Sequence, residues 1–241
     1  MTVSYLLGYR DIWQKKPVLR ALYGDYHRRM AAACSPGLTL EIGGGAGHLK
    51  ELREDVLSSD IQLAPWLDLV ADAQALPLAD ASLDNIVMLD VLHHVERPRR
   101  FFEEAQRCLR PGGRIVLLEP AMTPLSTLLY RFGHPEPVDM AADPLTDESP
   151  TPERDPYDAN QAIPTLLFRR TPKRFARLFP ELVLRRADLL SLFAFPLSGG
   201  FRPWSLVPAA LIPPLLALES ALLPLLGPLM AFRLLVVIER R

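Results

Sequence analysis

The strongest chemical signal in the chain is a glycine cluster placed directly after a carboxylate. Glu41 ends a short apolar run, and Gly43, Gly44, Gly45 and Gly47 follow it. Glycines between a strand and a helix let a ligand approach the backbone and leave amide donors exposed to it. The pattern indicates a nucleotide-like ligand, although a plain structural turn has the same composition.

The glycine spacing distinguishes between cofactor classes. The dinucleotide fingerprint requires glycine or alanine at its sixth position, counted from its first glycine. Counting from Gly43 places His48 there, and the third glycine comes one residue early at Gly47. The spacing therefore argues against a nicotinamide cofactor.

Alternating strand and helix patterns must position this loop. A leading helix is predicted over 17–33, because apolar residues recur every four positions there. Short apolar runs over 38–42, 55–60, 67–72, 83–90 and 114–120 read as strands, and 98–109 reads as a helix. Strands that alternate with helices predict an α/β fold with a Rossmann-like, doubly wound and mostly parallel sheet.

The second half of the chain differs in composition. Prolines and acidic residues crowd 135–156, which predicts an exposed excursion. A helix near 171–179, a strand near 182–187 and a last strand over 232–240 follow. We expect one domain over 1–241, divided into a leading helix (14–36), a cofactor-binding core (37–120), an active-site insertion (121–170) and a C-terminal half (171–241).

The segment 203–232 is very apolar and holds one formal charge, Glu219. Glu219 leaves two uncharged runs, both shorter than the roughly 20 residues that a spanning helix needs, and prolines interrupt them further. We expect buried helices that cover the sheet or a dimer face. The alternative is contact with a membrane surface.

The whole pattern resembles the class I S-adenosylmethionine-dependent methyltransferases. The resemblance runs from about residue 38 to 120 and rests on three stretches: EIGGGAG after the first strand, VADAQALPLADASLDNIVMLDVLHHV, and FFEEAQRCLRPGGRIVLLEP. Their order and spacing are those of the family, within its methyltransferase-11-like, small-molecule group. The resemblance implies S-adenosylmethionine as the cofactor and an antiparallel last strand.

The resemblance also implies the cofactor-binding residues. Glu41 and the four loop glycines would surround the methionine part, and Asp60 would bind the ribose hydroxyls, although it lies closer to the loop than usual. Asp72 and the Ala73 backbone would face adenine, with Asp72 as a turn cap the alternative. Leu89 would lie beside the sulfonium.

Methyl transfer from a sulfonium is an in-line displacement that positioning alone can accelerate strongly. A hydroxyl acceptor would still benefit from a general base, and the candidate catalytic residues are His94, His93 and Asp90. Each has a structural alternative: hydrogen bonding behind the site for the histidines, and a loop cap for Asp90. Other candidates for acceptor contact are Glu119, His134, Tyr157, Asp158, Asn160 and Gln161.

Composition bounds the partners and the compartment. The net charge of −1, from 27 basic and 28 acidic residues, gives no field for holding nucleic acid. Cys34 and Cys108 have no metal-ligand spacing, so neither a metal site nor a disulfide is indicated. We expect a cytoplasmic protein, with peripheral membrane contact through 203–232 as an added hypothesis.

Two other function classes remain open from the sequence. One is a nicotinamide-dependent oxidoreductase, which the glycine spacing disfavours. The other is a scaffold that keeps the cofactor fold without catalysis. The leading expectation is a methyltransferase for a small-molecule acceptor, with lipid- or sugar-linked acceptors favoured by the apolar segment.

Overall fold

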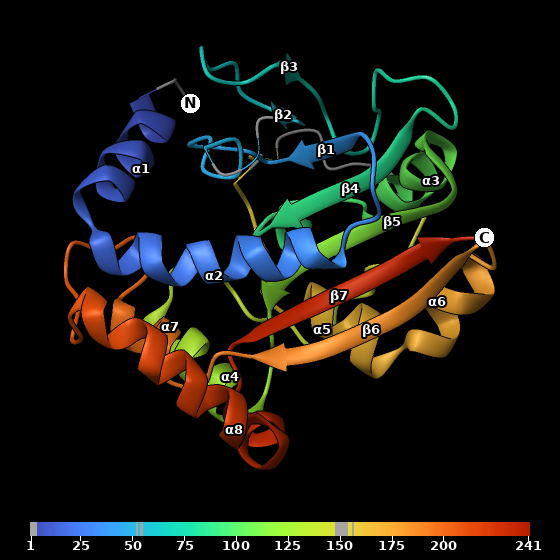
Figure 1. Ribbon diagram of the computed structural model, residues 1–241. Coiled ribbons are helices and arrows are strands. Elements are labelled where there is room, and N and C mark those ends of the chain that lie inside the picture. Colours follow the sequence, from blue (N-terminus) through green and yellow to red (C-terminus); the bar gives the residue numbers. More distant parts are fainter. Residues whose placement is uncertain (1–3, 52, 54, 148–153, 156) are drawn as a thin grey trace.

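The computed structural model describes residues 4–51, 53, 55–147, 154–155 and 157–241, and these form a seven-stranded sheet flanked by helices (Figure 1). The strand order is β3-β2-β1-β4-β5-β7-β6. Only β7 is antiparallel to its neighbours, β5 and β6, and the other pairings are parallel. The strands are β1 Thr39–Ile42, β2 Val56–Asp60, β3 Leu69–Val70, β4 Leu83–Leu89, β5 Leu109–Pro120, β6 Leu182–Leu190 and β7 Arg233–Arg240.

The central strands are buried on both faces, which explains their unbroken apolar sequences. Alternate residues of β5 enter two separate cores. Ile115 and Leu117 join one core, and Val116 and Leu118 join the other. The prediction of a mostly parallel, doubly wound sheet with an antiparallel last strand is therefore confirmed.

Each core has its own helical layer (Figure 1). One layer comprises α1 Ser4–Lys15, α2 Pro17–Ala33, α7 Ala194–Ser198, the short turn η3 Ala209–Leu211 and α8 Ile212–Met230. The other comprises α3 Pro98–Cys108, α5 Ile163–Thr165, the short π-helix η2 Leu166–Arg170 and α6 Pro172–Leu178. The turn η1 Leu92–His94 and the helix α4 Pro124–Gly133 follow β4 and β5 at the carboxyl edge of the sheet, the edge where open α/β folds bind ligands.

One local prediction is wrong at the glycine loop. The sequence predicts a helix directly after it, but residues 45–51 form successive turns. The loop amides are also already used, because the N–H groups of Gly44, Gly45 and Gly47 donate to Ser59, Asp60 and Gly44. The sequence predicts that the loop leaves its amide donors free for a ligand, but these three are already occupied.

The apolar segment 203–232 is also not a buried helical pair. It contains one continuous helical stretch, Ala209–Met230, which is long and apolar enough to cross a membrane by length and composition. The interior prolines Pro224 and Pro228 do not end α8. Most of the helix is exposed, and within α8 only Ile212, Glu219 and Gly227 are buried.

Candidate active site

The glycine loop is shaped first by packing inside the protein. A Cβ on Gly43 would lie 2.2 Å from a methyl group of Val91, and one on Gly44 would lie 2.1 Å from the Ser58 hydroxyl oxygen. A Cβ on Gly47 would lie 2.8 Å from the Trp66 ring. At Gly45 the nearest atom would be 3.7 Å away, so this glycine alone of the four could carry a Cβ without a collision.

Glu41 lies beneath the loop with its carboxylate buried. The Ser58 hydroxyl donates to its side chain at 2.5 Å. Burial raises the pKa of Glu41 to about 7, and the nearby charge of Asp60 acts in the same direction. A cationic ligand group beside Glu41 would satisfy this carboxylate.

Asp60 ends β2 next to the loop, as predicted. Its two oxygens accept from the backbone amides of Gly45 and Gln62, at 3.0 Å each. Burial raises the pKa of Asp60, and these amide bonds oppose the rise. Because each carboxylate oxygen has a second lone pair, hydroxyl groups of a ligand can still donate to Asp60.

The other predicted cofactor residues lie at or just beyond strand ends. Asp72 is exposed and accepts from the Gln74 backbone amide at 2.8 Å, so it forms a turn of the kind considered as its alternative role. Ala73 is buried beside it. Leu89 ends β4 and is half-buried. Contact of any of these residues with a cofactor remains a prediction.

Asp90, directly after β4, has a left-handed backbone with φ of 58°. Its carboxylate forms an ion pair with the fully buried Arg233 at 2.5 Å and accepts from the Tyr23 hydroxyl at 3.3 Å. The Arg233 guanidinium also lies over the rings of Tyr26 and Phe195. These contacts give Asp90 a structural task, and its predicted catalytic role stays a prediction.

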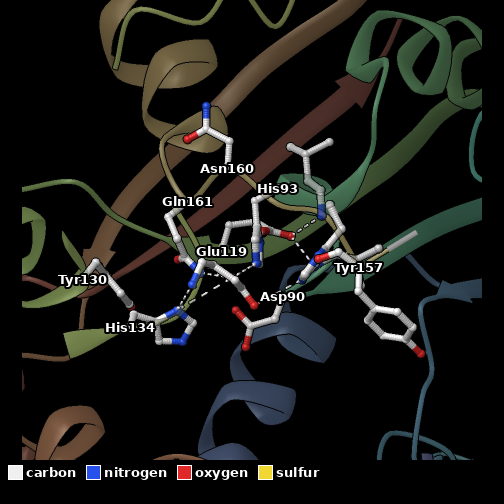
Figure 2. A network of polar contacts seen from close by, with 12 residues as sticks. Asp90, His93, Glu119, Tyr130, His134, Tyr157, Asn160 and Gln161 are labelled. Atoms are coloured by element: carbon white, nitrogen blue, oxygen red, sulfur yellow. Dashed lines mark hydrogen bonds and ion pairs between the residues drawn. The ribbon is translucent and has the colours of Figure 1, made fainter. Parts of the chain in front are cut away.

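His93 lies in a second polar cluster, with the buried Glu119 (Figure 2) and the half-buried Glu136. Its Nδ1 donates to the Glu119 carboxylate at 2.6 Å, and its Nε2 lies 3.4 Å from the Glu136 carboxylate. Glu119 also accepts from the backbone amides of Val91 and Leu92 at 2.9 and 2.8 Å. Glu119 thus fixes both the histidine and the turn that carries it.

The charges of this cluster stabilise one another. Burial disfavours an imidazolium at His93, but the charge and hydrogen bond of Glu119 outweigh burial and raise its pKa to about 10. Burial likewise disfavours ionisation of Glu136, but the hydrogen bond and charge of His93, with His94 and His134 adding to them, lower its pKa to about 2. Near neutral pH, His93 is protonated and unsuited to act as a base.

His94 has the opposite character. Burial, and then the positive charge of His93, lower its pKa, so its ring is neutral near pH 7. Its Nδ1 lies 3.2 Å from the Tyr157 carbonyl oxygen, which can only accept, so Nδ1 carries the proton. The Nε2 lone pair of His94 is therefore available, 3.9 Å from the Glu136 carboxylate.

The excursion after β5 supplies several other predicted residues to this cluster (Figure 2). Gln161 is buried and donates to the Glu136 carboxylate. The His134 Nδ1 accepts from the Glu136 backbone amide at 3.3 Å. The backbone amide of Asn160 donates to the His93 backbone carbonyl at 2.9 Å. Asp158 is exposed and bonds within its own loop.

Val91 joins the two parts of the site. Its side chain rests against Gly43, and its backbone amide donates to Glu119. The glycine loop and the histidine cluster are therefore neighbours along one edge of the sheet. Sequence analysis did not single out Glu136 or Arg233, because a carboxylate in a proline-rich loop and an arginine at a strand start carry no signal by themselves.

Comparison with known proteins identifies the core. Residues 40–117, about a third of the chain, match the family model described as a methyltransferase domain. The ubiquinone/menaquinone biosynthesis C-methyltransferase UbiE of Roseobacter denitrificans is 43% identical over 63 residues, which cover 26% of this chain and 25% of that protein. The demethylmenaquinone methyltransferase of Renibacterium salmoninarum is 31% identical over 120 residues, covering 42% and 51%.

These matches span about half or less of the length of the curated relatives. Solved structures extend the likeness of fold to most of the chain. Geranyl diphosphate C-methyltransferase from Streptomyces coelicolor has a TM-score of 0.51 at 14% identity, covering 91% of this chain and 80% of that chain. A SAM-dependent methyltransferase from Archaeoglobus fulgidus has a TM-score of 0.50 at 16% identity, covering 92% and 94%.

The order of the sheet, the loop over a buried carboxylate and the family match over 40–117 agree with the resemblance seen in the sequence. The chain contains a class I S-adenosylmethionine-dependent methyltransferase domain.

Proposed function

We propose that the whole protein transfers a methyl group from S-adenosylmethionine to a small-molecule acceptor. The observation that carries the proposal is the pairing of two buried features across Val91. The Glu41 carboxylate lies under the glycine loop, and the His93–Glu119–Glu136 cluster lies directly beyond it. The first fits the cofactor, and the second can orient an acceptor.

The cofactor fits the residues that are present. Glu41 is a buried carboxylate whose pKa is raised by burial, and the ammonium group of the cofactor would offset this by a charge-assisted contact. Asp60 retains acceptor capacity for ribose hydroxyls. The bound cofactor supplies the electrophilic methyl group, and we propose that His94, neutral at Nε2, accepts a proton from a hydroxyl acceptor.

Calorimetry with S-adenosylhomocysteine and with NADPH tests the cofactor site. We expect micromolar binding of the sulfur ligand and none of NADPH. Asp60→Ala should weaken binding at least tenfold, whereas Asp188→Ala, an exposed carboxylate on β6, should leave it unchanged. No binding to folded wild-type protein would overturn the proposal, and binding without turnover on any acceptor class would favour the scaffold alternative.

We further propose that the acceptor is an apolar or lipid-linked molecule reached at a membrane surface. The support is an exposed surface on α4 and α8, which contact each other. We name it the apolar surface; its residues are Leu128, Leu129 and Phe132 of α4 and Leu211, Leu218, Leu225 and Leu229 of α8 and the turn before it. Phe132 is 80% exposed and Leu225 is 76% exposed.

Two features favour a helix that lies on a bilayer over one that spans it. The sole charged residue in α8, Glu219, is buried against the protein and accepts from the Ala194 and Phe193 amides. The exposed leucines recur at spacings of seven and four, so they lie on one face. The end of α4 also leads within three residues to Glu136, which places the apolar surface close to the histidine cluster along the chain.

Flotation with phosphatidylcholine and phosphatidylglycerol vesicles tests this contact. We expect the wild type to float and the double variant Phe132→Ser, Leu225→Ser to stay behind. Leu63→Ser is the matched control, because Leu63 is 71% exposed and lies in the loop after β2. Absence of flotation, or dimerisation that depends on the same two side chains, would overturn membrane contact while leaving the cofactor result intact.

A further inference from the structure

We propose that His93, His94 and Glu136 form a site for one divalent transition-metal ion of the zinc and ferrous-iron class. One ligand atom of each residue lies within 4.8 Å of the other two. Two imidazoles and one carboxylate are a donor set that such ions prefer, with coordination positions left for other oxygen ligands. This inference goes beyond the proposed methyl transfer and concerns the acceptor side of the site.

Two histidine–carboxylate distances are close to those between ligands of one ion. The Nε2 atoms of His93 and His94 lie 3.4 and 3.9 Å from the two Glu136 oxygens. Ligand atoms about 2.0–2.2 Å from a tetrahedral zinc ion lie about 3.3–3.6 Å from one another. One pair already has this separation, and the other requires closure of about half an ångström.

The hydrogen bonds of both histidines support this assignment. The Nδ1 of His93 donates to Glu119, and the Nδ1 of His94 donates to the Tyr157 carbonyl oxygen. In metal sites, a ligating histidine almost always donates its other ring N–H to a carboxylate or a backbone carbonyl, which fixes the tautomer. Here both partners are in place, and both Nε2 atoms point toward the same carboxylate. Binding of the ion displaces the Nε2 proton that His93 carries in the ion-free protein.

The neighbouring polar groups hold the ligands in position but are not ligands themselves. Gln161 donates to Glu136 and holds the carboxylate in position. The lone pair of the His134 Nδ1 is used by the Glu136 backbone amide, and the Asp90 carboxylate is paired with Arg233. We therefore assign neither residue as a ligand: the ion-holding group formed by His93, His94 and Glu136 does not include His134, and the Asp90 carboxylate is held by Arg233.

The site is open on one side. The side chains of His94 and Glu136 keep 22% and 26% of their exposure, while Glu119 behind them is fully buried. An ion held there can bind an acceptor hydroxyl or carboxylate oxygen and lower the pKa of a bound hydroxyl. The His94 lone pair can therefore accept a proton, as proposed above, only in the ion-free protein; with the ion bound, His94 is a ligand, and the ion takes over the task of lowering the pKa of the hydroxyl.

The test uses tag-free protein, stripped with a chelator and titrated with Zn²⁺ or Co²⁺ alone. We expect one ion per chain by calorimetry, and visible absorption of the Co²⁺ form that reports imidazole ligation. His94→Gln and Glu136→Gln should each lower the affinity at least 100-fold. Glu119→Gln, which changes only the partner of a ligand, should lower it about 10–100-fold.

His134→Gln is the matched control, and we expect its affinity within threefold of wild type. Folding of every variant is verified by S-adenosylhomocysteine binding, which these changes should not alter. Lack of tight ion binding by folded wild type, unchanged affinity in His94→Gln and Glu136→Gln, or an equal loss in His134→Gln would overturn the site. Loss of S-adenosylhomocysteine binding in the wild type would instead count against the proposed methyl transfer, so the two failures are separable.

Discussion

At Gly43 two independent constraints meet, because the backbone is left-handed (φ 71°) and a Cβ would collide with Val91. Gly43→Ala should therefore lower the free energy of unfolding by about 2–4 kcal/mol and weaken cofactor binding. Gly112 has the same kind of backbone (φ 80°) with no atom within 4 Å of a Cβ. Gly112→Ala should cost only about 1 kcal/mol in urea unfolding, and equal losses in both variants would contradict the role of Val91.

Glu41 gives a second prediction, based on its pKa of about 7. A carboxyl group whose folded pKa lies above its unfolded value stabilises the fold below the unfolded pKa and loses that contribution as pH rises through the folded pKa. The ligand-free protein should thus lose about 3 kcal/mol from Glu41 between pH 4.5 and 7. In Glu41→Gln this loss should vanish, and S-adenosylhomocysteine binding should fall at least tenfold.

Urea unfolding of both proteins at pH 5 and pH 8 measures the effect, and an identical pH response would show that Glu41 is not the cause. At this scale the sequence predicts that Glu41, Asp60 and the two histidines lie along one edge of the sheet, because a parallel sheet brings the carboxyl ends of its strands together. Their roles in binding and catalysis stay predictions. Glu136 was not found, because its partners His93 and His94 lie about 40 residues earlier and only folding brings them together.

Among the elements, β7 is linked to β4 by the buried ion pair between Arg233 and Asp90. Arg233→Met should destabilise the protein by about 3–5 kcal/mol, because it leaves Asp90 partly buried without its cation. Adding Asp90→Asn to that variant should recover part of the loss. Arg186→Met, which breaks an exposed pair with Asp188, is the control and should cost less than about 1 kcal/mol.

If the single and double variants unfold at the same urea concentration, the ion pair does not couple these strands.

The sequence predicted most helices and strands correctly because apolar periodicity reflects which faces are buried. It was wrong for 45–51, where internal hydrogen bonds replace a helix, and for α8. The length of α8 was hidden because prolines read as breaks, and its exposure cannot be read from apolar composition alone.

The whole molecule is joined at its N-terminal side by a stack of rings from distant segments. His48 of the glycine loop stacks on Trp13 of α1, with ring centroids 3.8 Å apart, and on Phe201 at 6.0 Å. Burial lowers the pKa of His48 to about 3 and that of His27 to about 4. Neither contact was predictable, since His48 was read only as a departure from a nucleotide-binding pattern.

These two histidines predict sensitivity to acid. A histidine whose folded pKa lies below its unfolded value of about 6.5 contributes full stability above that value and loses it as pH falls. At pH 4.5 a buried neutral His48 should cost about 2–3 kcal/mol. His48→Phe keeps a ring in the stack but cannot be protonated. The free energy of unfolding of this variant, measured relative to wild type, should therefore be higher at pH 4.5 than at pH 7.5. Parallel pH profiles of the two proteins would contradict this account.

The position of β7 has a consequence for biosynthesis. Strand β6 is attached to the sheet only through β7, and β7 fills the place between β5 and β6. During translation, β6 and α8 leave the ribosome before β7, which joins β6 to the sheet. Until β7 pairs with β5 and β6, the side of α8 that packs on β6 has no completed sheet to cover, so this part of the fold closes only when β7 is in place.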